Sequence, residues 1–427
     1  MLRRILIATV LTFVVSFYLF PVSFTFIPQS INSKMLVAAF GVVMFIYDSI
    51  CRGGMQLSRT TLFSAMLAII FSLWCCYAVI HSSTYNYVYG TYIVSYMTWM
   101  AGAYGVYAAL RLRYGEVHLP LLTRYLTVVC LAQCAIAILI DNYPVVMHFV
   151  DRFIEQGQDF YRRAHRLYGI GAALDPGGIR FSAVLVLLAH QVATNEKLRA
   201  RRPYLIMAVV AFALITIFGA VISRTTLVGS ALGLAYMFFA LVRLRRGGFI
   251  TIQMVRTFAR FLIVVAVVIV VTILVYNKSQ AFRNYFRFGF EAFFNWVETG
   301  VFHTTSTDTL TERMWIWPTD PWAWVVGQGT FGIFQNNTDI GYCNFILYCG
   351  IIGLTLFSIF FLYCHLSLNR KFNNFQICSL LLIALTFIIW IKVTTDIFLI
   401  NALLFCIEGD DMEEEESVSE ELSPMVS

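Results

Sequence analysis

Apolar runs recur along almost the whole chain, separated by short polar connections. Most of these runs contain close to the ~20 residues that a helix needs to cross the hydrocarbon core of a bilayer. The pattern predicts an all-α polytopic membrane protein with about twelve transmembrane helices. The runs lie near residues 5–21, 35–50, 60–80, 88–110, 119–140, 179–194, 203–222, 225–242, 258–275, 342–365, 376–392 and 394–407.

The runs belong to one membrane domain, residues 1–407, without an internal repeat. The first run begins with Arg3 and Arg4 and is not followed by a small-residue cleavage site. We therefore expect it to be a retained anchor and not a cleaved signal peptide.

Positive charge alternates between the connections. Arginine and lysine gather in every second one: Arg52, Arg59; Arg111, Arg113; Lys197, Arg199, Arg201, Arg202; Arg243, Arg245, Arg246, Arg256, Arg260; Arg370, Lys371. Opposite connections such as 81–89 have no lysine or arginine. Because positive residues are retained on the cytoplasmic face, both termini are predicted to be cytoplasmic.

Two outer segments, 141–180 and 276–339, are much longer than the other connections. The first opens with an amphipathic pattern over 145–167, and glycine and proline then predict a loop over 169–178. The second opens with aromatic residues interleaved with charged ones over 279–298. This pattern is typical of a helix that lies in the membrane interface, in either a purely structural or a substrate-facing role.

Composition agrees with a membrane protein, since 59% of the residues are hydrophobic and only 13% are charged. The net charge of +6 divides between the inner connections and the outer segments, so it does not indicate a nucleic-acid partner. The cysteines lie mostly in or beside apolar runs, and no spacing indicates a metal site. Residues 408–427 are acidic and predict a disordered cytoplasmic tail.

Arginines in the outer segments contradict the usual charge distribution and indicate a bound anion. They are Arg152, Arg162, Arg163, Arg166, Arg180, Arg283, Arg287 and Arg313. Guanidinium groups suit bidentate contact with phosphate oxygens, so a lipid-linked phosphate is the predicted ligand.

Arg166 and Arg180 flank the glycine-rich loop, whose turn at 175–178 is expected to bring Arg180 to the membrane surface. Alternatively, they pair with the nearby carboxylates Asp151, Glu155, Asp159 and Asp175. Arg224 lies in a short connection between two apolar runs. A charge at that depth indicates a polar site or a side chain that reaches the headgroups.

The second outer segment also contains candidate catalytic and sugar-binding residues. Arg313 precedes a tryptophan-rich stretch, and Asp339 lies just before an apolar run, where a carboxylate can accept a proton from a sugar hydroxyl. Trp317, Trp322 and Tyr342 are candidates for stacking on sugar rings, and an interfacial aromatic belt is the alternative.

Lys392 and Asp396 are four residues apart in the last outer turn. The spacing favours an ion pair between them.

Three motifs resemble those of the O-antigen polymerase and ligase superfamily of bacterial envelope glycosyltransferases. They are an Arg-Leu-x-Gly loop at Arg166, a Ser-Arg pair at Arg224, and an Arg-x-x-x-Trp segment at Arg313 with Trp317. The last motif continues through Gly327 and Gly329 to a polar residue, Asp339, before a span rich in glycine and leucine.

The resemblance implies a polymerase that joins undecaprenyl-pyrophosphate-linked oligosaccharide repeats at the periplasmic face of the bacterial inner membrane. Arg166, Arg180, Arg224 and Arg313 would bind the pyrophosphate, Arg224 and Arg313 would stabilise the transition state, and Asp339 would be the base. The expected transfer is inverting and needs no metal or cofactor; the implied partners include membrane lipid, a flippase and a chain-length regulator.

Other functions stay open. Ligases of this superfamily have a histidine and an asparagine where this chain has Asp339 and Ile340, so the polymerase branch is favoured. A flippase of lipid-linked glycans would need polar residues through the depth of its helices, and the first five spans have almost none. A structural scaffold would not explain the outer arginines.

Overall fold

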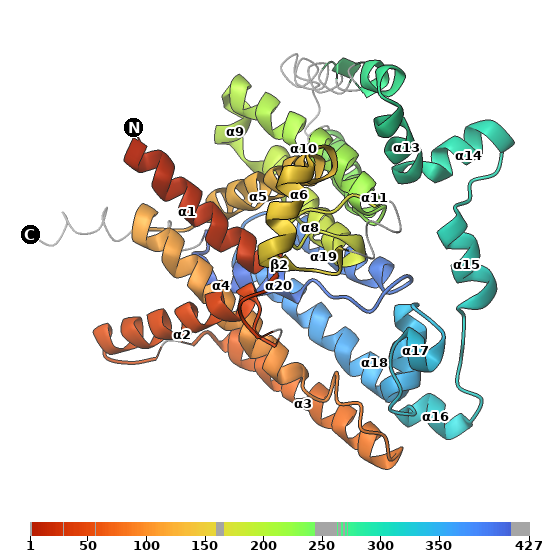
Figure 1. Ribbon diagram of the computed structural model, residues 1–427. Helices are drawn as coiled ribbons and strands as arrows, with labels where there is room; N and C mark the ends of the chain where they lie inside the picture. Colours follow the sequence, from red (N-terminus) through yellow and green to blue (C-terminus); the bar gives the residue numbers. More distant parts are fainter. Residues whose placement is uncertain are drawn as a thin grey trace, which may run out of the picture.

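The computed structural model describes residues 2–28, 30–55, 57–158, 166–243, 263, 266–267, 270 and 272–410. The described chain is almost entirely helical (Figure 1). In its first half the helices are α1 (Leu2–Leu19), α2 (Ser33–Cys51), α3 (Arg59–His81), α4 (Tyr92–Tyr114), α5 (Leu119–Asn142), α6 (Pro144–Phe153), α8 (Leu174–Thr194), α9 (Glu196–Ala200), α10 (Arg202–Ile222) and α11 (Thr226–Arg243).

The second half contains several short helices before the bundle resumes. These are α13 (Gln280–Gly289), α14 (Glu291–Thr299), α15 (Thr305–Arg313), α16 (Pro321–Val326), α17 (Ile333–Asn336), α18 (Gly341–Ser367), the 3-10 turn η2 (Leu368–Arg370), α19 (Gln376–Ile389) and α20 (Phe398–Cys406). Strands β1 (Ser23–Phe24) and β2 (Ile154–Glu155) form one short antiparallel pair.

Six described helices are long and apolar enough to cross a membrane. They are α2, α3, α5, α8, α10 and α18 together with η2. Two more apolar helices, Thr226–Phe239 and Gln376–Ile389, are shorter. The protein is therefore an all-α membrane protein, as the sequence predicts. The count of twelve crossings stays a prediction, because the predicted run 258–275 lies largely outside the described residues and α20 has only 9 residues.

Helix α8 occupies the centre of the bundle. Its residues from Gly177 to Ile179 and from Phe181 to Gln191 are buried, and it packs against α5, α10, α11 and α19. A second part of the core joins α3 to α18, where Phe357 stacks against Phe71 at 4.3 Å and against Trp390 at 5.4 Å between ring centroids. This packing fixes the helix ends that carry the polar residues considered below.

Helix α18 breaks at Gly350, which has φ 64° and ψ −175°. The break leaves backbone carbonyls near Gly350 without helical partners. Donors come from the chain after α16: Gln328 N–H donates to the Leu347 carbonyl at 2.6 Å, and Gly329 N–H donates to the Tyr348 carbonyl at 3.1 Å. A side chain at Gly350 would lie 2.1 Å from the Val325 carbonyl oxygen. Glycine therefore permits α16 and α18 to touch backbone to backbone.

The long segments differ from the sequence-based prediction in three places. The loop expected over 169–178 ends early, because α8 starts at Leu174 and accommodates Pro176 in its first turn, where N–H groups have no helical partner. The amphipathic helix expected over 145–167 ends at Phe153, and residues 159–165 lie outside the described part. The single interfacial helix expected over 279–298 is broken at Phe290 into α13 and α14.

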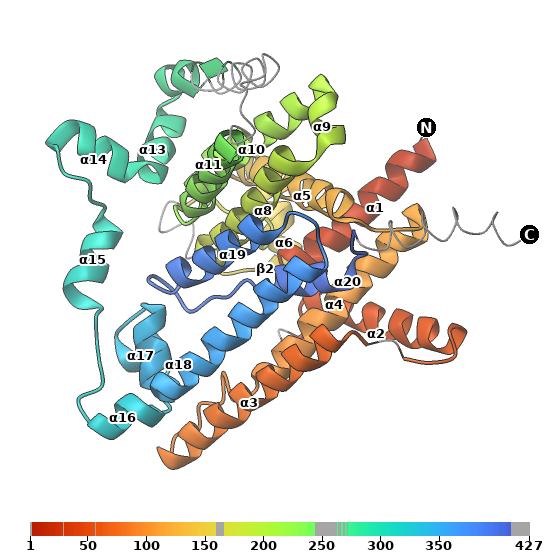
Figure 2. The ribbon, with the colours of Figure 1, turned by 180° about the vertical axis from the view of Figure 1, so that it is seen from behind.

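Helices α13, α14 and α15 form an arm that runs along one side of the bundle, opposite the start of α1 (Figures 1 and 2). Both views place α14 and α15 away from the central helices. The arm contacts the bundle chiefly through α13, which packs on α10.

The first residues of the predicted disordered tail, from Glu408 to Asp410, contact the bundle. Glu408 accepts hydrogen bonds from the Tyr107 hydroxyl and from Val117 N–H, both at 2.7 Å. Asp410 accepts one from Asn373 N–H at 2.8 Å. Residues 411–427 lie outside the described part.

Candidate functional site

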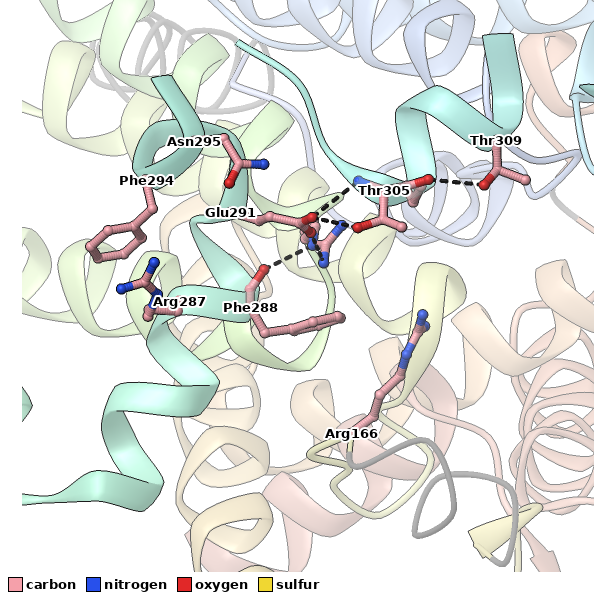
Figure 3. Close-up of a pocket in the computed structure, with 10 residues that line it drawn as sticks. Arg166, Arg287, Phe288, Glu291, Phe294, Asn295, Thr305 and Thr309 are labelled. Atoms are coloured by element: carbon pink, nitrogen blue, oxygen red, sulfur yellow. Dashed lines mark hydrogen bonds and ion pairs between the residues drawn. The ribbon is translucent and has the colours of Figure 1, made fainter. Parts of the chain in front are cut away.

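A cavity of about 560 Å³ lies where the arm meets the bundle (Figure 3). The arm contributes polar groups and aromatic rings, and the bundle contributes two arginines. Its lining residues are Arg166, Arg224, Arg287, Phe288, Glu291, Phe294, Asn295, Thr305, Ser306 and Thr309. Three arginines against one glutamate give this lining a net positive charge.

Arg224 is held in the turn between α10 and α11 by two residues of the arm. Its guanidinium carbon lies 4.1 Å from the centroid of the Phe288 ring, and its Nε donates to the Phe288 carbonyl at 2.8 Å. Its terminal nitrogen forms an ion pair with Glu291. Burial lowers the pKa of Arg224, and the neighbouring Glu291 opposes that shift. The predicted cation at this turn therefore lines a cavity.

Arg166 approaches the same aromatic ring from the loop before α8. Its guanidinium carbon is 5.4 Å from the Phe288 centroid, and Figure 3 shows it directed toward the side of the cavity where Thr305 lies. The described residues supply no hydrogen bond or ion pair to Arg166. Its charge lies close enough to contribute to the lowered pKa of Arg224. Of the four arginines predicted to bind one pyrophosphate, the structure brings Arg166 and Arg224 to the same aromatic ring.

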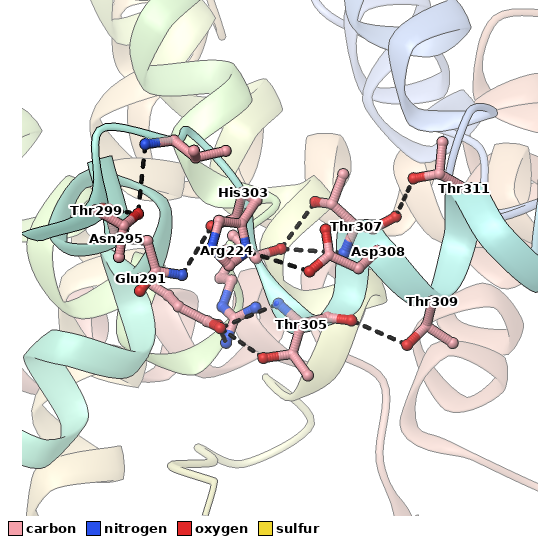
Figure 4. Close-up of polar contacts among 12 residues, drawn as sticks. Arg224, Glu291, Asn295, Thr299, His303, Thr305, Thr307, Asp308, Thr309 and Thr311 are labelled. Atoms are coloured by element: carbon pink, nitrogen blue, oxygen red, sulfur yellow. Dashed lines mark hydrogen bonds and ion pairs between the residues drawn. The ribbon is translucent and has the colours of Figure 1, made fainter.

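Glu291 was not among the predicted site residues. It is the first residue of α14, and one carboxylate oxygen accepts from Thr305 N–H at 3.0 Å and from the Thr305 hydroxyl at 2.6 Å (Figure 4). Burial raises the pKa of Glu291, but the bonds from Thr305 and the charge of Arg224 outweigh burial and lower it. Its spacing of four from Arg287 was the only signal in the sequence, and that spacing does not identify Arg224 as its partner.

Arg287 also lines the cavity, and it has a carboxylate of its own. It forms an ion pair with Glu298 at 2.5 Å, in which both side chains are nearly half exposed. Its guanidinium carbon lies 5.1 Å from the Phe294 ring centroid.

An acidic group adjoins the cavity at the start of α8. Asp175 forms an ion pair with Lys392 at 2.8 Å and accepts from the Thr225 hydroxyl at 2.5 Å. The predicted pair between Lys392 and Asp396 is therefore wrong. Asp396 instead accepts from Phe398 N–H at 2.9 Å and from the Tyr92 hydroxyl at 3.4 Å, because the chain after Lys392 is not helical.

Asp339 lies within electrostatic reach of this group. Burial raises the pKa of Asp339, the charge of Asp175 raises it further, and Lys392 opposes the rise. Asp175 in turn experiences the charge of Arg166. Asp339 does not line the cavity, but it belongs to the same electrostatic network.

Arg180 does not join the other arginines. It lies in α8, with its Nε buried and its guanidinium carbon 5.9 Å from the Phe20 ring centroid. The predicted delivery of Arg180 to the membrane surface is wrong, because the turn at 175–178 is part of the helix.

Arg313 and the predicted sugar-binding residues also lie outside the cavity lining. Arg313 is exposed at the end of α15. Trp317 stacks on Trp324 at 5.4 Å, Trp322 donates to His81 Nε2 at 2.9 Å, and the Tyr342 hydroxyl donates to the Phe387 carbonyl at 2.9 Å. Trp317 and Trp322 remain exposed by 37% and 53%, which leaves ring surface for a ligand.

Within the described ranges, no group of three or more His, Cys, Asp or Glu side chains is arranged to hold a metal ion. Comparison of the chain with models of known protein families, with curated proteins and with solved structures finds no match.

Proposed function

We propose that the protein is a polysaccharide polymerase of the bacterial inner membrane, which joins undecaprenyl-pyrophosphate-linked oligosaccharide repeats at the periplasmic face. The observation that carries the proposal is the cavity in which Arg166 and Arg224 both approach the Phe288 ring. A cavity of about 560 Å³ with net positive charge suits a diphosphate and its first sugar, since small-ligand sites occupy about 300–1,000 Å³.

Arg166 and Arg224 would bind the diphosphate and stabilise the negative charge that develops as the donor bond breaks. Pre-positioned cations in a partly buried site are strong stabilisers, because they need no reorganisation during the reaction. Arg224 meets this condition, since Phe288 and Glu291 hold its guanidinium in place.

The reaction is a direct displacement. A hydroxyl oxygen of the acceptor repeat forms a bond to the anomeric carbon of the donor, the bond from that carbon to the diphosphate oxygen breaks, and the electron pair leaves with undecaprenyl diphosphate. Asp339 takes the hydroxyl proton. Displacement from the opposite side inverts the anomeric centre. The arginines supply the positive charge, and we expect transfer to proceed without added divalent cation.

The exposed tryptophans between Arg313 and α17 would bind the acceptor glycan. Trp317 stacks on Trp324 at 5.4 Å between centroids, and Trp315 packs against Trp317 at 5.6 Å with the two rings tilted by 39°. This stack is connected to the segment that carries Asp339, because the Thr338 hydroxyl donates to the Met314 carbonyl at 2.5 Å.

Substitution of each arginine tests the proposal in the native host. We expect Arg224→Ala and Arg166→Ala to abolish the ladder of surface polysaccharide and to leave single repeats on the outer leaflet, with activity reduced about a hundredfold or more. Arg283→Ala is the matched control: Arg283 belongs to α13 but bonds only to the carbonyls of Tyr276 and Asn277 among the described residues.

Other outcomes would contradict the proposal. Repeats trapped on the cytoplasmic leaflet in Arg224→Ala would indicate a flippase, and normal chains that fail to reach their final acceptor would indicate a ligase. A purified protein that polymerises repeats only with a divalent cation would contradict metal independence.

A further inference from the structure

The carboxylate of Glu291 lies in the proposed diphosphate site and is paired there with Arg224. Its two oxygens contact Arg224 on the bundle and Thr305 on the arm. Only 17% of the Arg224 side chain and 20% of the Glu291 side chain are exposed. The pair is therefore enclosed in the cavity lining and is not a surface salt bridge.

The groups that hold Glu291 are the groups that hold phosphate in proteins. They are a guanidinium, a backbone N–H of the first helical residue of α15, and a hydroxyl. Arg166, whose guanidinium carbon is 5.4 Å from the Phe288 centroid, forms no ion pair with a carboxylate among the described residues. A diphosphate that approached Arg166 would meet Glu291 as a like charge at Arg224.

We propose that Glu291 is an internal substitute for the diphosphate: it binds Arg224 when the site is empty and is displaced from Arg224 when the donor binds. This inference rests on the proposed function, because the ligand that displaces Glu291 is the diphosphate of the donor. The exchange keeps Arg224 paired with an anion in both states.

The exchange gives the site a route to product release. A polymerase must discard undecaprenyl diphosphate after every transfer, and release limits many enzymes. Return of Glu291 to Arg224 lowers the affinity for the leaving diphosphate without removing the arginine that stabilises the transition state. Glu291 and Thr305 begin α14 and α15, so the exchange frees the starts of these two helices from Arg224, while the Phe288 carbonyl and the packing of α13 on α10 still hold the arm to the bundle.

Binding of inorganic pyrophosphate to the purified full-length protein in nanodiscs of neutral lipid tests this inference. Glu291→Gln keeps the size of the side chain and removes its charge. We expect this variant to bind pyrophosphate about tenfold more tightly than the wild type. A tenfold change lies within the usual range of coupling free energies, here between the Glu291–Arg224 pair and pyrophosphate binding. Calorimetry at fixed ionic strength measures the difference.

Glu312→Gln is the matched control, because it removes the same charge from the arm at an exposed position of α15 outside the cavity lining. We expect its affinity to change less than about twofold. In the double variant Arg224→Ala/Glu291→Gln, the gain is expected to vanish, because the gain depends on freeing Arg224.

The outcomes separate this inference from the proposed function. Equal or weaker binding by Glu291→Gln would overturn the inference, and the function would stand if Arg166→Ala still abolished polymer. Tighter binding by Glu291→Gln, with polymer unaffected by Arg166→Ala, would support the anion exchange and overturn the polymerase. Failure of every variant to bind pyrophosphate would overturn both.

Discussion

At the scale of single residues, Arg224 has more contacts than any other predicted site arginine. Phe288 provides a ring face and a carbonyl, and Glu291 provides the counter-charge. Replacement by lysine keeps the charge but loses the planar stacking and the Nε bond. This is why Arg224→Lys, like Arg224→Ala, is expected to lose most activity.

The pKa of Asp339 predicts how the reaction depends on pH. Asp339 acts as a base only when ionised, and its pKa is raised, so the rate should rise with pH above the range of an ordinary aspartate, about 4. Lys392 opposes that rise in the pKa. Lys392→Met should therefore shift the ascending limb of the pH–rate profile to higher pH, as measured with purified protein and lipid-linked repeats.

Lys278→Met provides the control, since Lys278 is exposed and the substitution removes the same charge. Its ascending limb should coincide with that of the wild type. A Lys392→Met profile that moved to lower pH would exclude Asp339 as the base.

The sequence alone predicted part of this site. A charged side chain in a short connection between two apolar runs indicates a polar site, so Arg224 was identifiable. The glycine-rich loop that follows Arg166 identified that residue. Glu291 was not identifiable as the partner of Arg224, because the ion pair joins helices far apart along the chain. Arg180 was misplaced because the helix start at Leu174 depends on packing of α8, which local glycine and proline do not reveal.

At the scale of elements, the break in α18 is the feature that a single substitution would disturb most. Gly350→Ala would place a Cβ 2.1 Å from the Val325 carbonyl oxygen at a positive φ. We expect a loss of more than about 3 kcal/mol in the free energy of unfolding, because both strain and displacement of α16 contribute. Thermal unfolding of the protein in detergent, followed by size-exclusion chromatography, measures this loss.

The control for this element is Gly54→Ala. A Cβ on Gly54 would meet no atom within 4 Å, so its effect should stay within about 0.5 kcal/mol. Equal stability of the two variants would show that α16 does not depend on the Gly350 break.

Element boundaries were predictable in the apolar runs and not in the arm. Period and length identified α3, α5 and α10, because lipid-facing helices need continuous apolar residues. The division of the arm at Phe290 has a weaker signal, the single glycine Gly289 among aromatic residues that continue on both sides. At this break the Phe288 carbonyl accepts from Arg224, so a contact with the bundle lies where α13 ends.

At the scale of the whole molecule, the start of α1 and the arm lie at opposite sides of the bundle (Figure 1). The predicted orientation places Cys51, which is exposed at the end of α2, in the cytoplasm, and Thr299, exposed at the end of α14, outside. A membrane-impermeant maleimide applied to cells stripped of their outer envelope should label Cys51→Ser/Thr299→Cys. It should not label the wild type until the membrane is permeabilised. The reverse pattern would invert the topology and place the cavity in the cytoplasm.

The bridge between Asp175 and Lys392 has a consequence for biosynthesis. Helix α8 is synthesised long before Lys392. Asp175 therefore has no lysine partner until more than half of the chain that follows α8 has been made. A chain that ends before Lys392 therefore has an acidic side chain at the start of α8 without the lysine that pairs with it in the complete protein.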